Sequence, residues 1–145
     1  MTGMTDAKTH VAFVCVQNAG RSQIATAYAE RERETRGLTD DVVIHSGGTH
    51  PADAVHDVVR EAMADVEIDL ADRKPQEIAT ETLESCDYVV TMGCSTLDLE
   101  ADTDVRDWDL PDPHGQEKET VHEIRNDVKT RVEALFDEIE ATRTD

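Results

Sequence analysis

The hydrophobic residues of this chain fall into two patterns: short apolar runs, and longer segments in which apolar residues recur every three or four positions. Short runs bounded by polar residues are typical of strands, whereas the longer spacing is typical of helices that bury one face. The short runs predict strands at residues 10–14, 42–45, 88–92 and 105–108. A shorter alternating segment at residues 66–70 is interpreted as a connection.

Helical segments alternate with these strands. The first covers residues 23–36 and is followed by Gly37, a residue that commonly ends helices. The second covers residues 54–64. The last is the clearest, because its apolar residues keep the helical spacing throughout: Val121, Ile124, Val128, Val132, Leu135, Phe136 and Ile139. This alternation predicts an α/β fold, with a four-stranded parallel sheet and helices on both faces.

A length of 145 residues suits one domain, and no linker or repeat divides the chain. We expect a domain over residues 10–141, preceded by a flexible polar segment over residues 1–9. No apolar stretch has the length of a signal peptide core or a membrane span, so we expect a cytoplasmic protein. The three cysteines, an odd number at irregular spacing, do not indicate a disulfide scaffold, and no cysteine or histidine spacing indicates a metal site.

The composition is strongly acidic, with 33 acidic and 14 basic residues and a net charge of −19. A hydrophobic fraction of 38% and clear periodicity argue against disorder, and the even spread of carboxylates argues against an acidic tail. The remaining interpretation is adaptation to high salt, where a Debye length of ~3 Å at 1 M screens the repulsion. Nucleic acids and anionic membranes are poor partners for such a surface.

The first predicted strand leads into a segment that suits an oxyanion. A loop from a strand into a helix turns backbone N–H groups inward, where they and the helix dipole hold an anion. The same field favours the thiolate of Cys15, and Arg21 offers a planar fork of donors for two anion oxygens. We therefore predict a nucleophile at Cys15 and an oxyanion site made of the residues that follow it: Val16, Gln17, Asn18, Ala19, Gly20, Arg21 and Ser22.

Three of these residues have properties that suit an anion-binding loop. Ser22 offers its hydroxyl to the sulfur, Asn18 tolerates a left-handed backbone, and Gly20 allows close approach. The alternative interpretation is that Cys15 is a small buried structural residue and that Arg21 lies on a solvated helix turn. The strand-like run before Cys15 and the helical pattern after Ser22 favour the oxyanion site.

Ligands of parallel sheets bind at the carboxyl ends of the strands. This rule indicates which of the other candidate residues should lie near Cys15. Cys94 follows the third predicted strand, so it should share an edge with Cys15. Cys86 precedes that strand, which puts it roughly 15–20 Å away at ~3.3 Å per residue, and we expect a structural thiol there. Asp112 lies between Pro111 and Pro113 after the fourth strand, where a carboxylic acid beside a bound anion suits a proton donor.

The segment around Cys15 resembles the anion-binding loop shared by low-molecular-weight protein tyrosine phosphatases and the arsenate reductases of the same fold. Its ending, Arg21-Ser22-Gln23, resembles the reductase branch, because phosphatases more usually carry Pro after the Ser. Three further segments match in order, so the resemblance covers roughly residues 10 to 140. They are Ser46-Gly47-Gly48-Thr49-His50-Pro51, Val89-Val90-Thr91-Met92-Gly93-Cys94 and Asp107-Trp108-Asp109-Leu110-Pro111-Asp112-Pro113-His114-Gly115.

This resemblance implies an arsenate reductase of the low-molecular-weight phosphatase fold. Cys15 would attack the oxyanion, arsenate or phosphate, while Arg21 stabilises its oxygens and Asp112 protonates the leaving oxygen. Cys94 resembles the resolving thiol of the reductases. The resemblance also implies a thiol reductant as co-substrate, either a small thiol or a thioredoxin-like protein, and no tightly bound cofactor.

Alternatives remain open at this point. A phosphatase would hydrolyse the Cys15 adduct with water, but the chain has only two Tyr, two Phe and one Trp to wall a phosphotyrosine slot. A non-enzymatic oxyanion or redox sensor is disfavoured because Cys15, Arg21 and Asp112 are all present. Thioredoxin-linked reductases carry a further cysteine shortly after Cys94, and residues 95–99 contain none. Gln17 and Gly20 also form a loop variant that resembles reductases that use an external low-molecular-weight thiol.

Overall fold

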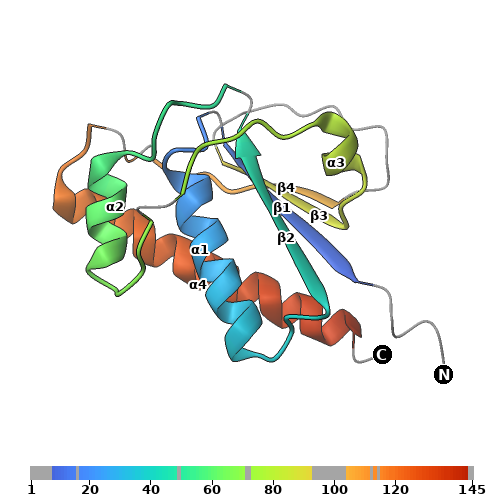
Figure 1. Ribbon diagram of the computed structural model, residues 1–145. Helices are drawn as coiled ribbons and strands as arrows, with labels where there is room; N and C mark the ends of the chain where they lie inside the picture. Colours follow the sequence, from blue (N-terminus) through green and yellow to red (C-terminus); the bar gives the residue numbers. More distant parts are fainter. Residues whose placement is uncertain are drawn as a thin grey trace.

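The computed structural model describes residues 8–15, 17–48, 50–70, 73–92, 104–111, 113 and 115–143. Within these ranges the chain alternates strands and helices (Figure 1). In chain order the elements are β1 (Thr9–Cys15), α1 (Arg21–Thr35), β2 (Val42–Gly48), α2 (Asp57–Ala64), α3 (Thr80–Glu84), β3 (Tyr88–Met92), β4 (Asp104–Asp107) and α4 (Lys118–Arg143).

The four strands form one parallel sheet in the order β2-β1-β3-β4, which confirms the predicted fold class. The central strand β1 ends at Cys15, whose register partners are Gly48 at the end of β2 and Met92 at the end of β3. The carboxyl ends of three strands therefore meet around Cys15. Helices cover both faces of β1, and for this reason its central residues are apolar without alternation and completely buried.

The two faces of the sheet are covered unequally. Val11 and Phe13 point into the larger core, which α1, α2 and α4 close on one side of the sheet (Figure 1). Ala12 and Val14 point to the other side, where they join a small cluster with Leu83 of α3. The prediction of helices on both faces is confirmed, with one short helix alone on the second face among the described elements.

The long helix α4 shows why the sequence periodicity was informative. Its apolar residues at steps of three and four, from Val121 to Ile139, are buried against α1 and α2. At its C-terminal end, Asp137 and Glu140 form ion pairs with Arg36, which follows α1. Gly37 ends α1 as predicted: its φ is +69°, and the N–H of Leu38 bonds to the carbonyl of Arg33 at 2.8 Å.

The structure corrects several predicted boundaries. Helix α3 was not predicted, because a five-residue helix with one buried residue, Leu83, is too short to show a period. Helix α2 begins at Asp57 rather than at residue 54, and β4 begins at Asp104 with Val105 42% exposed, as suits an edge strand. Residues 66–70 form a connection, as predicted. Of the helices in the described ranges, none has both the length and the apolar character to span a membrane.

Candidate active site

The sulfur of Cys15 lies at the end of the central strand with only 3% of the residue exposed. Two groups contact it: the hydroxyl oxygen of Ser22 at 2.9 Å and the backbone N–H of Asn18 at 3.2 Å. Ser22 comes from the first turn of α1, and Asn18 comes from the loop between β1 and α1. Hydrogen bonds to the sulfur favour its charged form, which is the nucleophilic form of cysteine.

Asn18 holds this loop through a fully used side-chain amide. Its backbone is left-handed, with φ +52°, as the sequence predicted, and the residue is completely buried. Its Nδ2 donates to the hydroxyls of Ser22 at 2.7 Å and Ser46 at 2.9 Å. Its Oδ1 accepts from the backbone N–H of Gln76 at 3.0 Å and from Nε2 of Gln23 at 3.1 Å. The loop is therefore fixed before any ligand binds.

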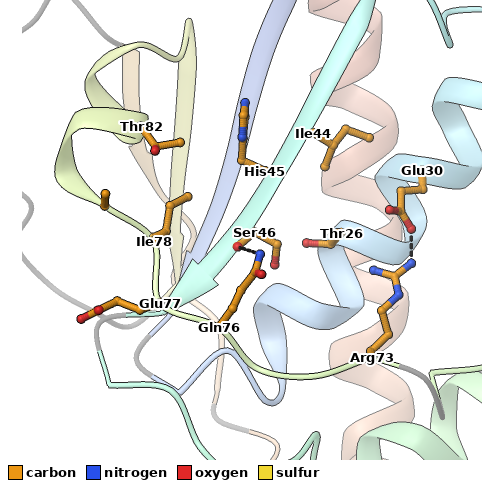
Figure 2. Close-up of a pocket in the computed structure, with 11 residues that line it drawn as sticks. Thr26, Glu30, Ile44, His45, Ser46, Arg73, Gln76, Glu77, Ile78 and Thr82 are labelled. Carbon is orange, nitrogen blue, oxygen red and sulfur yellow. Dashed lines mark hydrogen bonds and ion pairs between the residues drawn. The ribbon is translucent and has the colours of Figure 1, made fainter.

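Gln76 ties the loop to the edge strand β2. Its carbonyl accepts the N–H of Gly48 at 2.9 Å, and its side chain donates to the carbonyl of Ser46 at 2.7 Å (Figure 2). The chain can pass this close because Gly47 has no side chain: a Cβ there would lie 2.4 Å from Cβ of Ile78. The sequence did not reveal the role of Gln76, because the contact depends on the approach of two segments that are distant in the chain.

A hollow of about 510 Å³ lies beside β2, behind this network (Figure 2). Ser46 and Gln76 line it, and an ion pair between Arg73 and Glu30 crosses its side near α1. Its lining residues do not include Cys15. This hollow is therefore a space behind the candidate oxyanion site, and not its opening.

Arg21 connects the loop to the segment that follows β4. It is the first residue of α1 and is half-buried, and its Nη1 donates to the carbonyl of Leu110 at 3.0 Å. The neighbouring Gly20 contacts the same segment, because a Cβ at that position would lie 2.9 Å from Cγ of Pro113. The structure thus brings Arg21 and the residues that flank Asp112 to one edge of the sheet, as the parallel topology implies.

His56 supports the loop from the side of α2, which the sequence did not predict. Its backbone N–H donates to the carbonyl of Ala19 at 2.9 Å, and its ring nitrogen Nε2 lies 3.1 Å from Oε1 of Gln17. The N–H of Ala52 donates to the carbonyl of Gln17 at 3.0 Å. The segment before α2 therefore holds the outer side of the loop through both backbone and side chain.

Cys86 is separated from this site. Asp87, the next residue, bonds to the carbonyl of His10, so Cys86 lies near the start of β1 rather than near its end at Cys15. Its thiol donates to the carbonyl of Thr82 at 3.3 Å, and burial, with a smaller effect of Asp87, raises the pKa of Cys86 to about 11. A protonated, buried thiol in the small cluster agrees with the expected structural role.

Three predicted site residues, Val16, Cys94 and Asp112, lie outside the described residues, so their roles stay predictions. In the described ranges, His, Cys, Asp and Glu side chains do not gather in threes as a metal site would require.

Comparisons with known proteins agree with this geometry. A family described as "Low molecular weight phosphotyrosine protein phosphatase" matches residues 10–144. A putative arsenate reductase from Halobacterium salinarum is 62% identical over 134 residues, which cover 92% of this chain and 94% of that protein. The chain therefore belongs to the low-molecular-weight phosphotyrosine protein phosphatase family, on its arsenate reductase branch, and the resemblance found in the sequence is confirmed.

Two solved structures of arsenate reductases are similar to this chain over most of its length. A thioredoxin-dependent arsenate reductase from Corynebacterium glutamicum superposes with a TM-score of 0.77 at 29% identity, covering 94% of this chain and 64% of that protein. This chain thus spans somewhat less than two thirds of that relative's length. An arsenate reductase in a phosphate-binding state superposes with a TM-score of 0.76 at 27% identity, covering 90% of this chain and 98% of that one.

Proposed function

We propose that this protein is an arsenate reductase that converts arsenate to arsenite through Cys15 and a thiol reductant. The observation that carries the proposal is the buried Cys15 sulfur, which accepts a hydrogen bond from the N–H of Asn18 and lies 2.9 Å from the hydroxyl oxygen of Ser22 at the start of a preformed loop. The 62% identity to a putative arsenate reductase supports the choice of substrate. The phosphate-binding state of a related reductase supports an oxyanion ligand.

In the first step, the Cys15 thiolate attacks arsenic and an S–As bond forms. The As–OH bond breaks, and the leaving hydroxyl takes a proton from Asp112 and departs as water. The backbone N–H groups of the loop and the guanidinium of Arg21 hold the other oxygens, where negative charge collects. The hydrogen bond from Nη1 of Arg21 to the carbonyl of Leu110 holds the guanidinium beside the loop, and a guanidinium in this place offers planar donors to anion oxygens.

In the second step, another thiolate attacks the sulfur of Cys15. An S–S bond forms, the S–As bond breaks, and its electron pair stays on arsenic, which is reduced from As(V) to As(III) and leaves as arsenite. The cysteine is now oxidised to a disulfide, and a further thiol must reduce it before the next cycle. A thiol reductant is therefore a co-substrate of this reaction rather than a bound cofactor.

The second thiol belongs either to Cys94 or to an external molecule. Cys86 does not fit this role, because it lies in the small cluster, near the opposite end of β1, and its thiol is protonated at neutral pH. We propose Cys94 for the internal route, since it follows β3, which ends beside Cys15. A small thiol or a thioredoxin-like protein then reduces the disulfide, and thioredoxin is the reductant named for the Corynebacterium relative.

The placement of the aromatic residues argues against a phosphotyrosine phosphatase. All five lie in the described ranges, and none lies free at the carboxyl edge. Four of them are buried in the larger core: Phe13, Tyr28, Trp108 and Phe136. The fifth, Tyr88, packs against the guanidinium of Arg106 at the beginning of β3. These rings are engaged in packing, so the described part of the chain offers no aromatic wall for a tyrosyl ring.

The test compares two reactions in one preparation at multimolar KCl. Arsenite release from arsenate and hydrolysis of para-nitrophenyl phosphate are measured with and without added thiol, with Cys15→Ser as the inactive control. We expect thiol-dependent arsenite release that exceeds ester hydrolysis. Brisk ester hydrolysis, with no arsenite under any thiol condition, would contradict the proposal and leave the phosphatase alternative.

The resolving thiol is tested by mass spectrometry of arsenate-treated protein without reductant. A disulfide between Cys15 and Cys94 is expected, with Cys94→Ser stopping at the arsenic adduct and Cys86→Ser behaving as wild type. An unresolved adduct in the wild-type protein, released only by an added small thiol, would show that resolution is external.

A further inference from the structure

Gly20 and Pro113 are in direct contact although they are far apart in the sequence. Gly20 directly precedes α1, and its carbonyl accepts the N–H of Ile24 in the first turn of that helix. A Cβ added to Gly20 would lie 2.9 Å from Cγ and 3.5 Å from Cδ of Pro113. Carbon atoms do not approach to 2.9 Å, and a proline ring is closed onto its own backbone. Any side chain at Gly20 must therefore displace the chain at Pro113.

The surroundings of Gly20 direct this displacement towards Pro113. On another side, Cδ2 of His56 lies 3.6 Å from the same Cβ position. His56 is held in place, because its backbone bonds to Ala19 and its ring to Gln17. Gly20 itself is held by the hydrogen bond to Ile24. A Cβ on Gly20 would therefore shift Pro113 rather than His56.

A second contact ties the same segment to the loop. The guanidinium of Arg21 donates to the carbonyl of Leu110. The adjacent residues Gly20 and Arg21 therefore contact Pro113 and Leu110, which lie on either side of Asp112 in the sequence. Pro111 and Pro113 restrict the backbone between these contacts, since each proline fixes its own φ. Two described residues that flank Asp112 in the sequence, Leu110 and Pro113, are thus in contact with the anion loop.

We propose that Gly20 is a positioning residue for proton transfer: its missing side chain lets Pro113, the residue after Asp112, lie against the anion loop. This inference rests on the proposed function, in which Asp112 is the proton donor. Proton transfer needs donor and acceptor about 2.6–3.2 Å apart, and a misplacement of about 1 Å costs up to about 100-fold in rate. A methyl group at Gly20 would lie 2.9 Å from Cγ of Pro113, and ordinary contact at 3.4–4 Å needs a shift of about 0.5–1 Å.

The test is Gly20→Ala, followed by the rate of arsenic adduct formation at Cys15 and by competitive inhibition with inorganic phosphate. We expect adduct formation about 10- to 100-fold slower, with the phosphate inhibition constant within about threefold of wild type. The pH profile of the variant should lose the alkaline limb that a proton donor produces, as in Asp112→Asn. Gly37→Ala is the control for a loss of stability alone: its Cβ meets nothing within 4 Å, but its φ of +69° strains the backbone at the other end of α1, and adduct formation should stay as in wild type.

Measuring Gly20→Ala in two variant proteins, Asp112→Asn and Pro113→Ala, tests whether its effect depends on the proton donor and on the proline ring. With Asp112→Asn already present, Gly20→Ala should cause little further loss, because the proton donor is gone. With Pro113→Ala present, the penalty of Gly20→Ala should shrink, because Cγ and Cδ are absent. Should Gly20→Ala fail to fold, Pro113→Ala alone carries the test, and a changed pH profile with unchanged phosphate inhibition is then expected.

Equal losses in all three backgrounds, or weaker phosphate inhibition, would overturn the positioning role and indicate a distorted anion loop. If the wild-type protein forms the arsenic adduct and Gly20→Ala forms it equally fast, the positioning role of Gly20 is wrong and the proposed function still stands. If the wild-type protein forms no arsenic adduct at all, the proposed function fails, and this role of Gly20 fails with it.

Discussion

The hydroxyl oxygen of Ser22 lies 2.9 Å from the sulfur of Cys15 and accepts a hydrogen bond from Nδ2 of Asn18 at 2.7 Å. Because the Asn18 amide nitrogen can only donate, the Ser22 proton is not used in that bond, and Ser22 can donate it to the Cys15 sulfur when that sulfur is a thiolate. A chain of donors thus runs from Asn18 through Ser22 to Cys15. It stabilises negative charge on a sulfur that the fold has otherwise buried.

Replacement of Ser22 by Ala should slow the attack by Cys15. The change removes one hydrogen bond to a charged group, worth ~1.5–3 kcal/mol, which corresponds to about a 10- to 100-fold slower step. Stopped-flow measurement of arsenic adduct formation at saturating arsenate checks this. Ser85→Ala is the control, since that hydroxyl bonds to Thr82 at the end of α3. Equal rates for Ser22→Ala and wild type would show that the bond does not assist the nucleophile.

Replacement of Cys15 by Ser should abolish turnover but keep oxyanion binding. The loop amides and Arg21 remain in place, whereas a serine hydroxyl at this position is a far weaker nucleophile than a thiolate. Phosphate binding is measured by calorimetry, and turnover by arsenite release. A Cys15→Ser protein that keeps a substantial fraction of wild-type turnover would exclude Cys15 as the nucleophile.

His45 should make the protein less stable in mild acid. Its ring stacks on that of His10 with centroids 5.3 Å apart, and burial, with a smaller effect of His10, lowers the pKa of His45 below its ordinary 6.5. The folded state therefore prefers the neutral ring. This contribution to stability is complete above pH 6.5 and declines as the pH falls through the unfolded-state pKa.

The test of the His45 prediction is the urea concentration at the midpoint of unfolding, measured between pH 7.5 and about pH 5, a range that spans the unfolded-state pKa of histidine. His45→Gln should lose less stability over this range than wild type, whereas a variant of the exposed residue His50, His50→Gln, should follow wild type. Parallel curves for wild type and His45→Gln would contradict the prediction.

High salt should stabilise the fold. Repulsion within a net charge of −19 opposes compaction, and concentrated KCl screens it to within a few ångströms. The high identity to a protein of Halobacterium salinarum supports this interpretation of the composition. We expect the thermal midpoint to rise from dilute buffer to about 2–3 M KCl, well beyond ordinary screening. An unchanged midpoint would contradict the high-salt interpretation.

Elements with local signals could be predicted from the sequence. The apolar run before Cys15, the helical spacing of α4 and the glycine at the end of α1 lie within a few turns of chain, so propensity and periodicity predicted them. The parallel topology followed from the alternation of strands and helices. That topology in turn predicted that Arg21 and the segment around Asp112 meet at one edge.

The contacts that hold the anion loop could not be predicted from the sequence. Asn18 bonds to Ser46 and Gln76, which are 28 and 58 residues away, and Gly20 contacts Pro113, which follows the edge strand β4. None of these partners carries a local signal, because a hydrogen bond or a steric contact between distant segments depends on the registers and crossings that packing sets. Close approach, unlike a helix or a strand, is a property of two surfaces and becomes visible only when both are in place.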